Sequence, residues 1–216
     1  EKSGLAGISG SLLATGTTKN SKAEIDEAVD YIGANLSTGP TGGFASSLTK
    51  HTDKVLSLFS DVILKPAFPE SEFEKIKTQT LSGLQTEKDD PNAISGNVSN
   101  ALTYGTTHPY GEITNESTVS NISLEDCKNY YNTYFKPGNA YLVIVGDITP
   151  EAAKTKAEKY FGSWPAGKTP EYEYAFPKGV DNTSVAFIDK SGAVQSVINI
   201  TYALDLNPGA PDAIPA

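Results

Sequence analysis

Apolar residues recur at helical spacing along much of the chain. The clearest run begins at Thr52 and places Val55, Leu58 and Val62 three or four residues apart, until Pro66 ends the segment. Other helix starts are marked by a capping residue, or by a proline at the first helical position, at Ser21, Ser71, Ser123 and Thr149 with Pro150. The pattern predicts helices over residues 4–13, 21–32, 52–65, 71–88, 92–104, 123–135 and 149–161.

Shorter apolar segments predict strands. Residues 34–50 favour two strands joined by a turn at 39–43, and residues 140–145 form an apolar run typical of a buried strand. A further pair is predicted at 184–188 and 196–201, after a proline- and glycine-containing linker at 163–181. Helices and strands therefore alternate irregularly, which predicts an α+β domain followed by the first strands of another.

Composition narrows the possible partners. The 216 residues suffice for one full domain and part of a second. The net charge of −9 argues against nucleic acid, and no apolar run approaches the ~20 residues that span a bilayer. The single Cys127 excludes an internal disulfide and a thiolate zinc cluster, and its helical surroundings predict a buried, structural thiol.

The ends of the sequence suggest a fragment of a longer protein. The chain opens inside a predicted helix, contains no methionine and finishes without a closing element. We therefore expect that a targeting segment, if there is one, precedes Glu1.

Several segments, in their order along the chain, resemble the pitrilysin/insulinase (inverzincin) family of zinc peptidases. The likeness is strongest between Thr52 and Pro165 and, with the N-terminal segment, covers nearly the whole chain. It implies a pitrilysin-type α/β domain, with an antiparallel-rich sheet packed by helices, over 1–165. A linker at 166–181 and the start of a second, similar domain at 182–216 would follow. The segments that carry it are Ser60-Asp-Val-Ile-Leu-Lys-Pro-Ala-Phe-Pro69, Asp89-Asp-Pro91, His108-Pro-Tyr-Gly111, Gly138-Asn-Ala-Tyr-Leu-Val-Ile-Val-Gly-Asp147, Tyr160-Phe-Gly-Ser-Trp-Pro165 and Gly192-Ala-Val-Gln-Ser196.

Active members of that family bind zinc through H-x-x-E-H on a helix. Two imidazoles four residues apart share one helical face and one metal, while the glutamate before the second histidine holds the attacking water. In this chain the resemblance places Gly7 and Ser11 at the histidine positions and Gly10 at the glutamate position. A later helix offers Ser82-Gly83 where the family has a glutamate pair, so Gly83 replaces the last ligand. We therefore expect no catalytic residue, no metal ligand and no zinc in this chain.

Other candidate sites are weaker. His51 stands near Asp53 and could share a metal with it, although a surface or capping histidine is more typical. His108 belongs to the His-Pro-Tyr-Gly segment and is predicted to be structural. Asp89 and Asp90 could chelate calcium, but adjacent carboxylates at a helix end are more often solvated. No nucleophile–base pair or phosphate loop is visible.

The resemblance also implies where peptide would bind. Substrates in the family add as a strand to an exposed sheet edge, and the matching residues here are Asn35, Leu36, Ser37 and Thr38. An ordinary edge strand is the competing interpretation. The small residues at Gly7 and Gly10 could leave room for a peptide or a partner's backbone, or could reflect drift after loss of zinc.

These features favour a non-catalytic subunit that helps to form a chamber and holds peptide for a zinc-bearing homologous partner. Three alternatives remain open: a structural, core-type subunit of a larger complex, an active zinc endopeptidase with unrecognised ligands, and an unrelated binding role. A neighbouring gene with an intact H-x-x-E-H would favour the first hypothesis, and metal analysis would identify the active peptidase.

Overall fold

The computed structural model describes residues 2–177 and 182–202, which form two compact units. The first unit comprises residues 1–81 and 116–171, and the second comprises 82–115 and 172–216. These two units are not the predicted domains, and the domain boundaries predicted at residues 165 and 181 remain a prediction. Parts of the predicted linker (178–181) and of the predicted second domain (203–216) lie outside the described residues.

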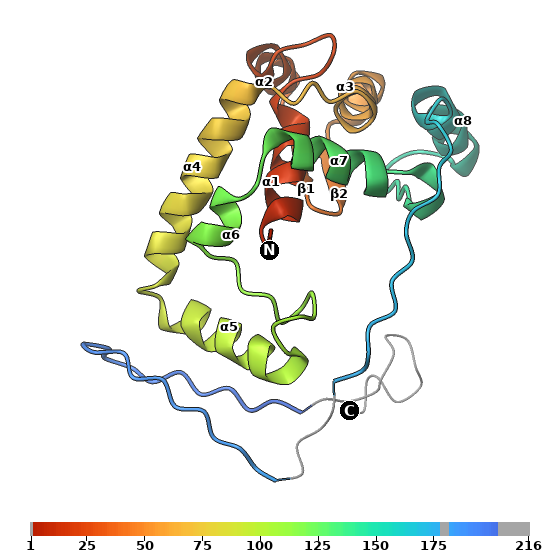
Figure 1. The fold of residues 1–216 in the computed structure, drawn as a ribbon. Helices are drawn as coiled ribbons and strands as arrows, with labels where there is room; N and C mark the ends of the chain where they lie inside the picture. The colour runs from red at the N-terminus through yellow and green to blue at the C-terminus, as the bar shows by residue number, and fades with distance from the viewer. Residues whose placement is uncertain (1, 178–181, 203–216) are drawn as a thin grey trace. The chain divides into compact units, whose positions relative to one another are not determined.

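Eight α-helices occupy the described residues, seven of them close to the predicted positions, whereas the short α6 was not predicted (Figure 1). Three of the four predicted starts have the expected N-cap: Ser21 and Ser123 each accept a bond from the backbone N–H three residues on and complete a capping box, and Thr149 caps a helix that starts with Pro150. The fourth, Ser71, lies inside a helix that begins at Glu70. The helices are α1 (Leu5–Leu12), α2 (Lys22–Tyr31), α3 (Thr52–Leu64), α4 (Glu70–Glu87), α5 (Pro91–Tyr104), α6 (Glu116–Ser120), α7 (Leu124–Tyr134) and α8 (Pro150–Phe161), with 3₁₀ turns at Leu13–Thr15, Thr49–His51 and Pro137–Asn139.

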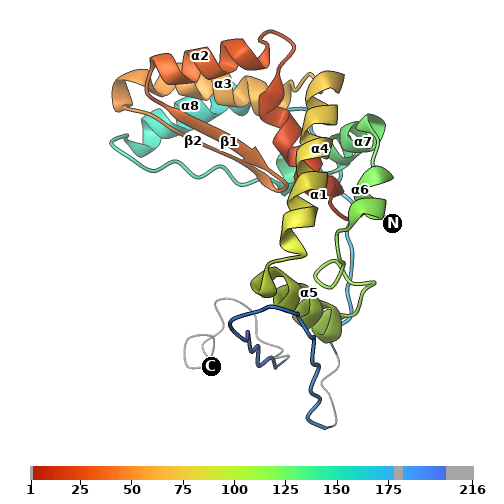
Figure 2. The same ribbon diagram turned by 90° about the vertical axis from the view of Figure 1, so that its left-hand side faces the viewer.

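One antiparallel hairpin is present in the described residues, as predicted for 34–50. Strand β1 (Asn35–Gly39) pairs with β2 (Gly42–Ser46), and the pairing closes at Gly39 and Gly42 around a two-residue turn. Helix α1 packs against β1 and α3 against β2, so the hairpin lies among helices of the first unit (Figure 2).

The core of the first unit joins α1, α3 and α7. Leu12, Val62 and Cys127 are completely buried, and each apolar side chain buried in this way contributes about 1.5–3 kcal/mol. Burial raises the pKa of the Cys127 thiol, so the expected buried, structural cysteine is confirmed. Lys77 Nζ donates to the carbonyl oxygens of Ser120 and Ile122 and thereby ties α4 to the end of α6 and the turn that follows it.

The predicted strand at 140–145 is wrong: these residues form no strand in the structure, and Tyr141 and Val145 are 98% and 91% exposed. A strand buried on both faces requires neighbouring strands, and in the described residues β1 and β2 pair only with each other. The apolar run is therefore extended without a ladder.

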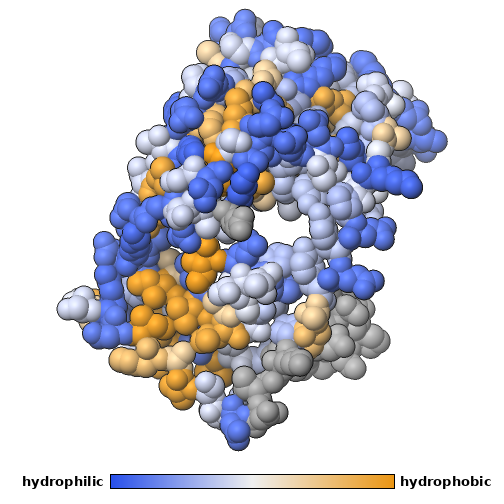
Figure 3. All heavy atoms as spheres, viewed as in Figure 1, coloured by the Kyte–Doolittle hydropathy of each residue, from blue (hydrophilic) through white to orange (hydrophobic). Residues whose placement is uncertain are grey.

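The predicted strand pair in the second unit is also wrong. Residues 184–188 and 196–201 form no ladder; instead Asn199 donates to Ser95 and Thr201 lies 3.2 Å from the Ser99 hydroxyl, along α5. Apolar side chains such as Phe187 and Ile198 remain exposed. The space-filling view shows an area of apolar surface in this part of the chain (Figure 3). The alternation of apolar and polar residues predicts an extended backbone in these segments. It does not predict which other segment, if any, forms hydrogen bonds with them to make a sheet.

Acid is expected to weaken the contact between the N-terminus and α7. The Lys2 ammonium, 2.6 Å from the carboxylate, and the Ser123 hydroxyl and backbone N–H lower the pKa of Asp126 from 3.8 to about 2. Because the folded pKa lies below the unfolded one, this stabilisation is present above the unfolded value and is lost as the pH falls towards 2. Urea unfolding of the wild type should therefore lose more free energy between about pH 4 and pH 2 than that of Asp126→Asn. Equal pH slopes in the two proteins would contradict this, with Glu125→Gln as a control for charge on the same helical turn.

Candidate functional site

Helix α1 carries three of the four predicted metal-site positions. Gly7 and Ser11 are exposed, whereas Ile8 and Leu12 are buried, so positions four apart share the open face as the helical period requires. A Cβ built at Gly7 would meet nothing within 4 Å. Side chains at positions 7 and 11 would therefore project from the surface of the helix.

Gly10, by contrast, has no free space around its Cα atom. It is buried, and a Cβ at this position would overlap the carbonyl carbon and oxygen of Gly39 and the nitrogen of Pro40. The position that the resemblance predicts for the catalytic base is thus occupied by the turn between β1 and β2. The expectation that small residues leave room for a peptide therefore fails at Gly10, because the chain's own backbone takes the space; at Gly7 the space is open.

The fourth position, Gly83, is exposed on α4, and a Cβ there would meet nothing within 4 Å. It belongs to the second unit, whereas α1 belongs to the first. The structure thus brings Gly7, Gly10 and Ser11 together on one helix and places Gly83 on another.

These residues do not fit a zinc ion. Zinc in proteins is bound by histidine, cysteine or carboxylate side chains, and the four positions supply only one hydroxyl. Among the described residues, no three histidine, cysteine, aspartate or glutamate side chains lie close enough together to share a metal.

The weaker metal candidates are engaged elsewhere. Asp53 lies 2.6 Å from Lys156 Nζ and accepts a 2.7 Å bond from Tyr160, and these contacts lower its pKa. His51 is the N-cap of α3, without a side-chain capping bond. Asp53 therefore ties α3 to α8, which accounts for this carboxylate without a metal.

The other two candidates lie in the second unit. His108 stacks on Tyr104 and accepts a bond from the Tyr110 backbone N–H, as expected of a structural histidine. Asp89 pairs with Lys190 at 2.6 Å, so its charge is compensated by an ammonium. Asp90 caps α5 by accepting from the Asn92 backbone N–H.

The predicted peptide-binding residues, Asn35, Leu36, Ser37 and Thr38, all lie on β1. Each is paired with β2 on one side, and in the described residues no third strand pairs with the other edge of β1. That edge is the feature that a peptide strand could extend.

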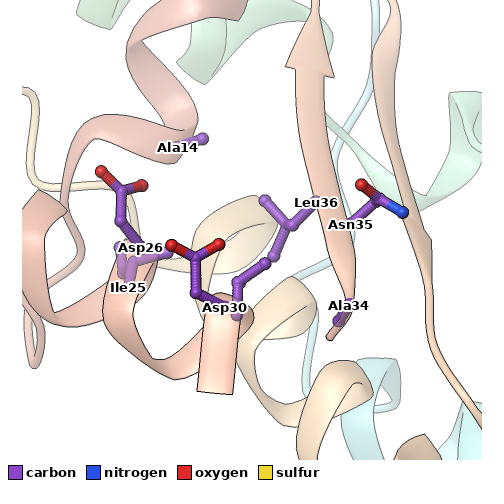
Figure 4. Close-up of a pocket in the computed structure, with 8 residues that line it drawn as sticks. Ala14, Ile25, Asp26, Asp30, Ala34, Asn35 and Leu36 are labelled. Carbon is purple, nitrogen blue, oxygen red and sulfur yellow. The ribbon is translucent and has the colours of Figure 1, made fainter. Parts of the chain in front are cut away.

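A cavity of about 350 Å³ opens where β1 begins. Two carboxylates from successive turns of α2, Asp26 and Asp30, stand on one side, and Leu36 points towards α2 while the Asn35 amide points away (Figure 4). Sequence reasoning missed the two aspartates, although their spacing of four on a helix next to β1 was a visible signal. The full lining is Ala14, Ile25, Asp26, Val29, Asp30, Ala34, Asn35 and Leu36.

Comparison with protein families agrees with this arrangement. Residues 1–111 match the model of the insulinase family, peptidase family M16, and residues 121–209 match the model described as the peptidase M16 inactive domain. This chain belongs to peptidase family M16. The predicted family is thereby confirmed.

Curated relatives of this M16 chain differ in their descriptions. An uncharacterized zinc protease of Rickettsia felis is 25% identical over 78% of the chain and 42% of its own length. The mitochondrial-processing peptidase subunit beta of Caenorhabditis elegans is 22% identical over 68% of the chain and 33% of its own length. A non-peptidase homolog of Helicobacter pylori, YmxG, is 23% identical over 59% of the chain and 30% of its own length. The chain spans less than half the length of each.

Solved structures confirm the fold. The peptidase M16 inactive domain from Pseudomonas fluorescens superposes with a TM-score of 0.72 at 22% identity, over 83% of this chain and 45% of that one. The M16 α/β fold expected from the sequence is therefore present. As for membranes, none of the described helices is both long and apolar enough to cross a bilayer.

Proposed function

We propose that this M16 chain is a non-catalytic subunit or homologue that helps to enclose peptide substrate for a zinc-bearing relative. The proposal rests on α1: the predicted ligand positions 7 and 11 offer a single hydroxyl, and the predicted base position, Gly10, lies against the hairpin turn. An enzyme of this family needs a metal-bound water and a base to attack a peptide bond. This chain offers neither at those positions.

The second edge of β1, which pairs with no strand among residues 2–177 and 182–202, supports a role in holding substrate. An extended peptide could bond to the backbone of Asn35–Thr38, and the edge is interrupted by no proline. Asp30 beside the first residues of β1, together with the net charge of −9, favours a basic peptide; Asp26 already pairs with Lys22 on the same helix. We therefore propose basic peptides as the substrate class held at this edge.

The relatives are compatible with such a role. The relatives include a zinc protease, a subunit of a processing peptidase and a non-peptidase homolog. The family is therefore not restricted to single-chain peptidases. We extend the subunit role from these relatives to the present chain as part of the proposal.

Metal analysis of the purified protein tests the absence of a zinc site. We expect no stoichiometric zinc, because the α1 positions offer a single hydroxyl as donor. The measurement is inductively coupled plasma mass spectrometry after dialysis against a weak chelator. One equivalent of zinc that stays bound after dialysis, with a ligand on or next to α1, would overturn the proposal. It would favour an active peptidase with other ligands.

A further inference from the structure

The turn of the hairpin is held from two sides within the first unit. On one side, Gly10 of α1 lies so close to Gly39 and Pro40 that no side chain fits between the two backbones. On the other side, the Tyr130 hydroxyl of α7 donates a 3.1 Å hydrogen bond to the Pro40 carbonyl oxygen. Together, Gly10, Tyr130 and the turn residues 39–40 are named the turn clamp below.

The second strand is held by a similarly close approach. A Cβ at Gly43 would lie 2.7 Å from the Phe59 ring and 3.3 Å from Ile63, so β2 is pressed against α3. Gly43 is paired with Thr38 across the ladder. The hairpin therefore packs against α3 along β2 and against the turn clamp at its end. At Gly43 the α3 atoms are the ends of side chains, whereas at Gly10 all the nearest atoms belong to the backbone.

We infer that the former base position has become a seat for the hairpin turn, and that the turn clamp fixes the position of the β1 edge. Register in a two-residue hairpin is set by its turn, so displacing residues 39–40 displaces the backbone groups of residues 35–38 as well. Tyr130 is thus a positioning residue for β1. The part of this inference that concerns peptide rests on the proposed function; the part that concerns the turn does not.

The inference explains why two glycines of the same helix are not equivalent. At Gly7 a methyl group would meet open space, and replacing glycine by alanine inside a helix normally stabilises it. At Gly10 the same methyl group must displace the backbone of the turn. Loss of zinc ligands followed by simple drift would predict equal tolerance at both positions.

The test compares Gly7→Ala, Gly10→Ala and Tyr130→Phe in the full-length protein by hydrogen–deuterium exchange. Gly7→Ala should raise the melting temperature slightly or leave it unchanged, and should keep the exchange rates of residues 35–46. Gly10→Ala should lower the melting temperature and speed exchange in residues 35–46 about tenfold or more, relative to the rest of the first unit. Equal exchange of the hairpin in Gly7→Ala and Gly10→Ala would overturn the inference.

Tyr130→Phe tests the same contact with the turn, and it can be used if Gly10→Ala does not fold. It preserves the aromatic ring, which lies 4.8 Å from that of Tyr134, and removes only the donor to Pro40. We expect a nearly unchanged melting temperature, with faster exchange confined to the turn and β1. Unchanged exchange at residues 39–43 would show that the hydroxyl does not hold the turn.

A binding measurement separates the two parts of the inference. The probe is a fluorescein-labelled peptide rich in lysine and leucine, titrated against wild type and Tyr130→Phe, and the latter should bind it several-fold more weakly. Altered exchange with unchanged affinity would leave the turn clamp standing and reject β1 as the peptide edge. If the wild type itself does not bind the probe, the proposed function fails, while the exchange data still decide the turn clamp.

Discussion

Gly10→Glu is expected to destabilise the protein by about 3 kcal/mol, although glutamate is the residue that the family's motif carries at this position. The cause is the backbone of Gly39 and Pro40, which lies where the new Cβ would be and cannot rotate away as a flexible side chain could. Urea denaturation of the full-length protein measures the effect. A Gly10→Glu variant as stable as the wild type would contradict the observed packing of the turn.

The matched control is the pair of histidine positions on the open face of α1. Gly7→His with Ser11→His should fold normally, since both positions are exposed, and two imidazoles four residues apart can share a metal. This variant should bind zinc or nickel weakly and hydrolyse nothing, because it lacks the base and a further ligand at Gly83. Folded Gly7→His/Ser11→His protein that takes up no metal would show that these positions are not the family's ligand positions.

Much of the helical framework could be predicted from the sequence, because helix signals are local. The capping boxes at Ser21 and Ser123 and the Thr149-Pro150 start act within one turn of chain, and all three helices begin where expected. The hairpin at 35–46 was equally accessible, since glycine and proline mark its turn between two short strands.

Strands without a local partner could not be predicted reliably. The run at 141–145 has the composition of a buried strand, yet a strand becomes buried only when other strands pair with it, and pairing depends on residues far away in the sequence. The segments at 184–188 and 196–201 failed for the same reason.

The candidate site could also be predicted only in part from the sequence. The lack of zinc-ligand residue types at Gly7, Gly10, Ser11 and Gly83 can be read directly from the sequence, because glycine has no side-chain donor atom and a lone serine hydroxyl is a poor zinc ligand. The different surroundings of Gly7 and Gly10 cannot, since the turn that meets Gly10 lies about thirty residues further along the chain. The cavity between α2 and β1 also depends on tertiary packing, and only the spacing of Asp26 and Asp30 hinted at it.

The second large effect is expected in a mixture with a zinc-bearing M16 homologue. The full-length protein alone should cleave nothing, and its addition should raise the homologue's kcat/KM for a basic peptide about tenfold, which corresponds to ~1.4 kcal/mol of transition-state stabilisation. The physical reason is that a second chain with an available strand edge and an acidic cavity can orient peptide while the partner supplies metal and base.

Asp30→Asn tests the contribution of the cavity to this stimulation. We expect the variant to lose part of the stimulation with basic peptides and to keep it with neutral ones, because only the charge beside β1 is removed. Glu27→Gln is the matched control, since it makes the same charge change on α2 but lies outside the cavity lining. Equal losses in the two variants would attribute the effect to net charge and not to the cavity.

The most direct test of the non-catalytic subunit role is co-purification of the full-length protein with its zinc-bearing homologue, followed by turnover measurements with and without this chain. The account predicts a complex on size exclusion, zinc in the homologue alone, and peptide cleavage that is faster in the complex than with the homologue by itself. Equal cleavage rates together with separate elution of the two proteins would contradict it and favour a purely structural role in another assembly.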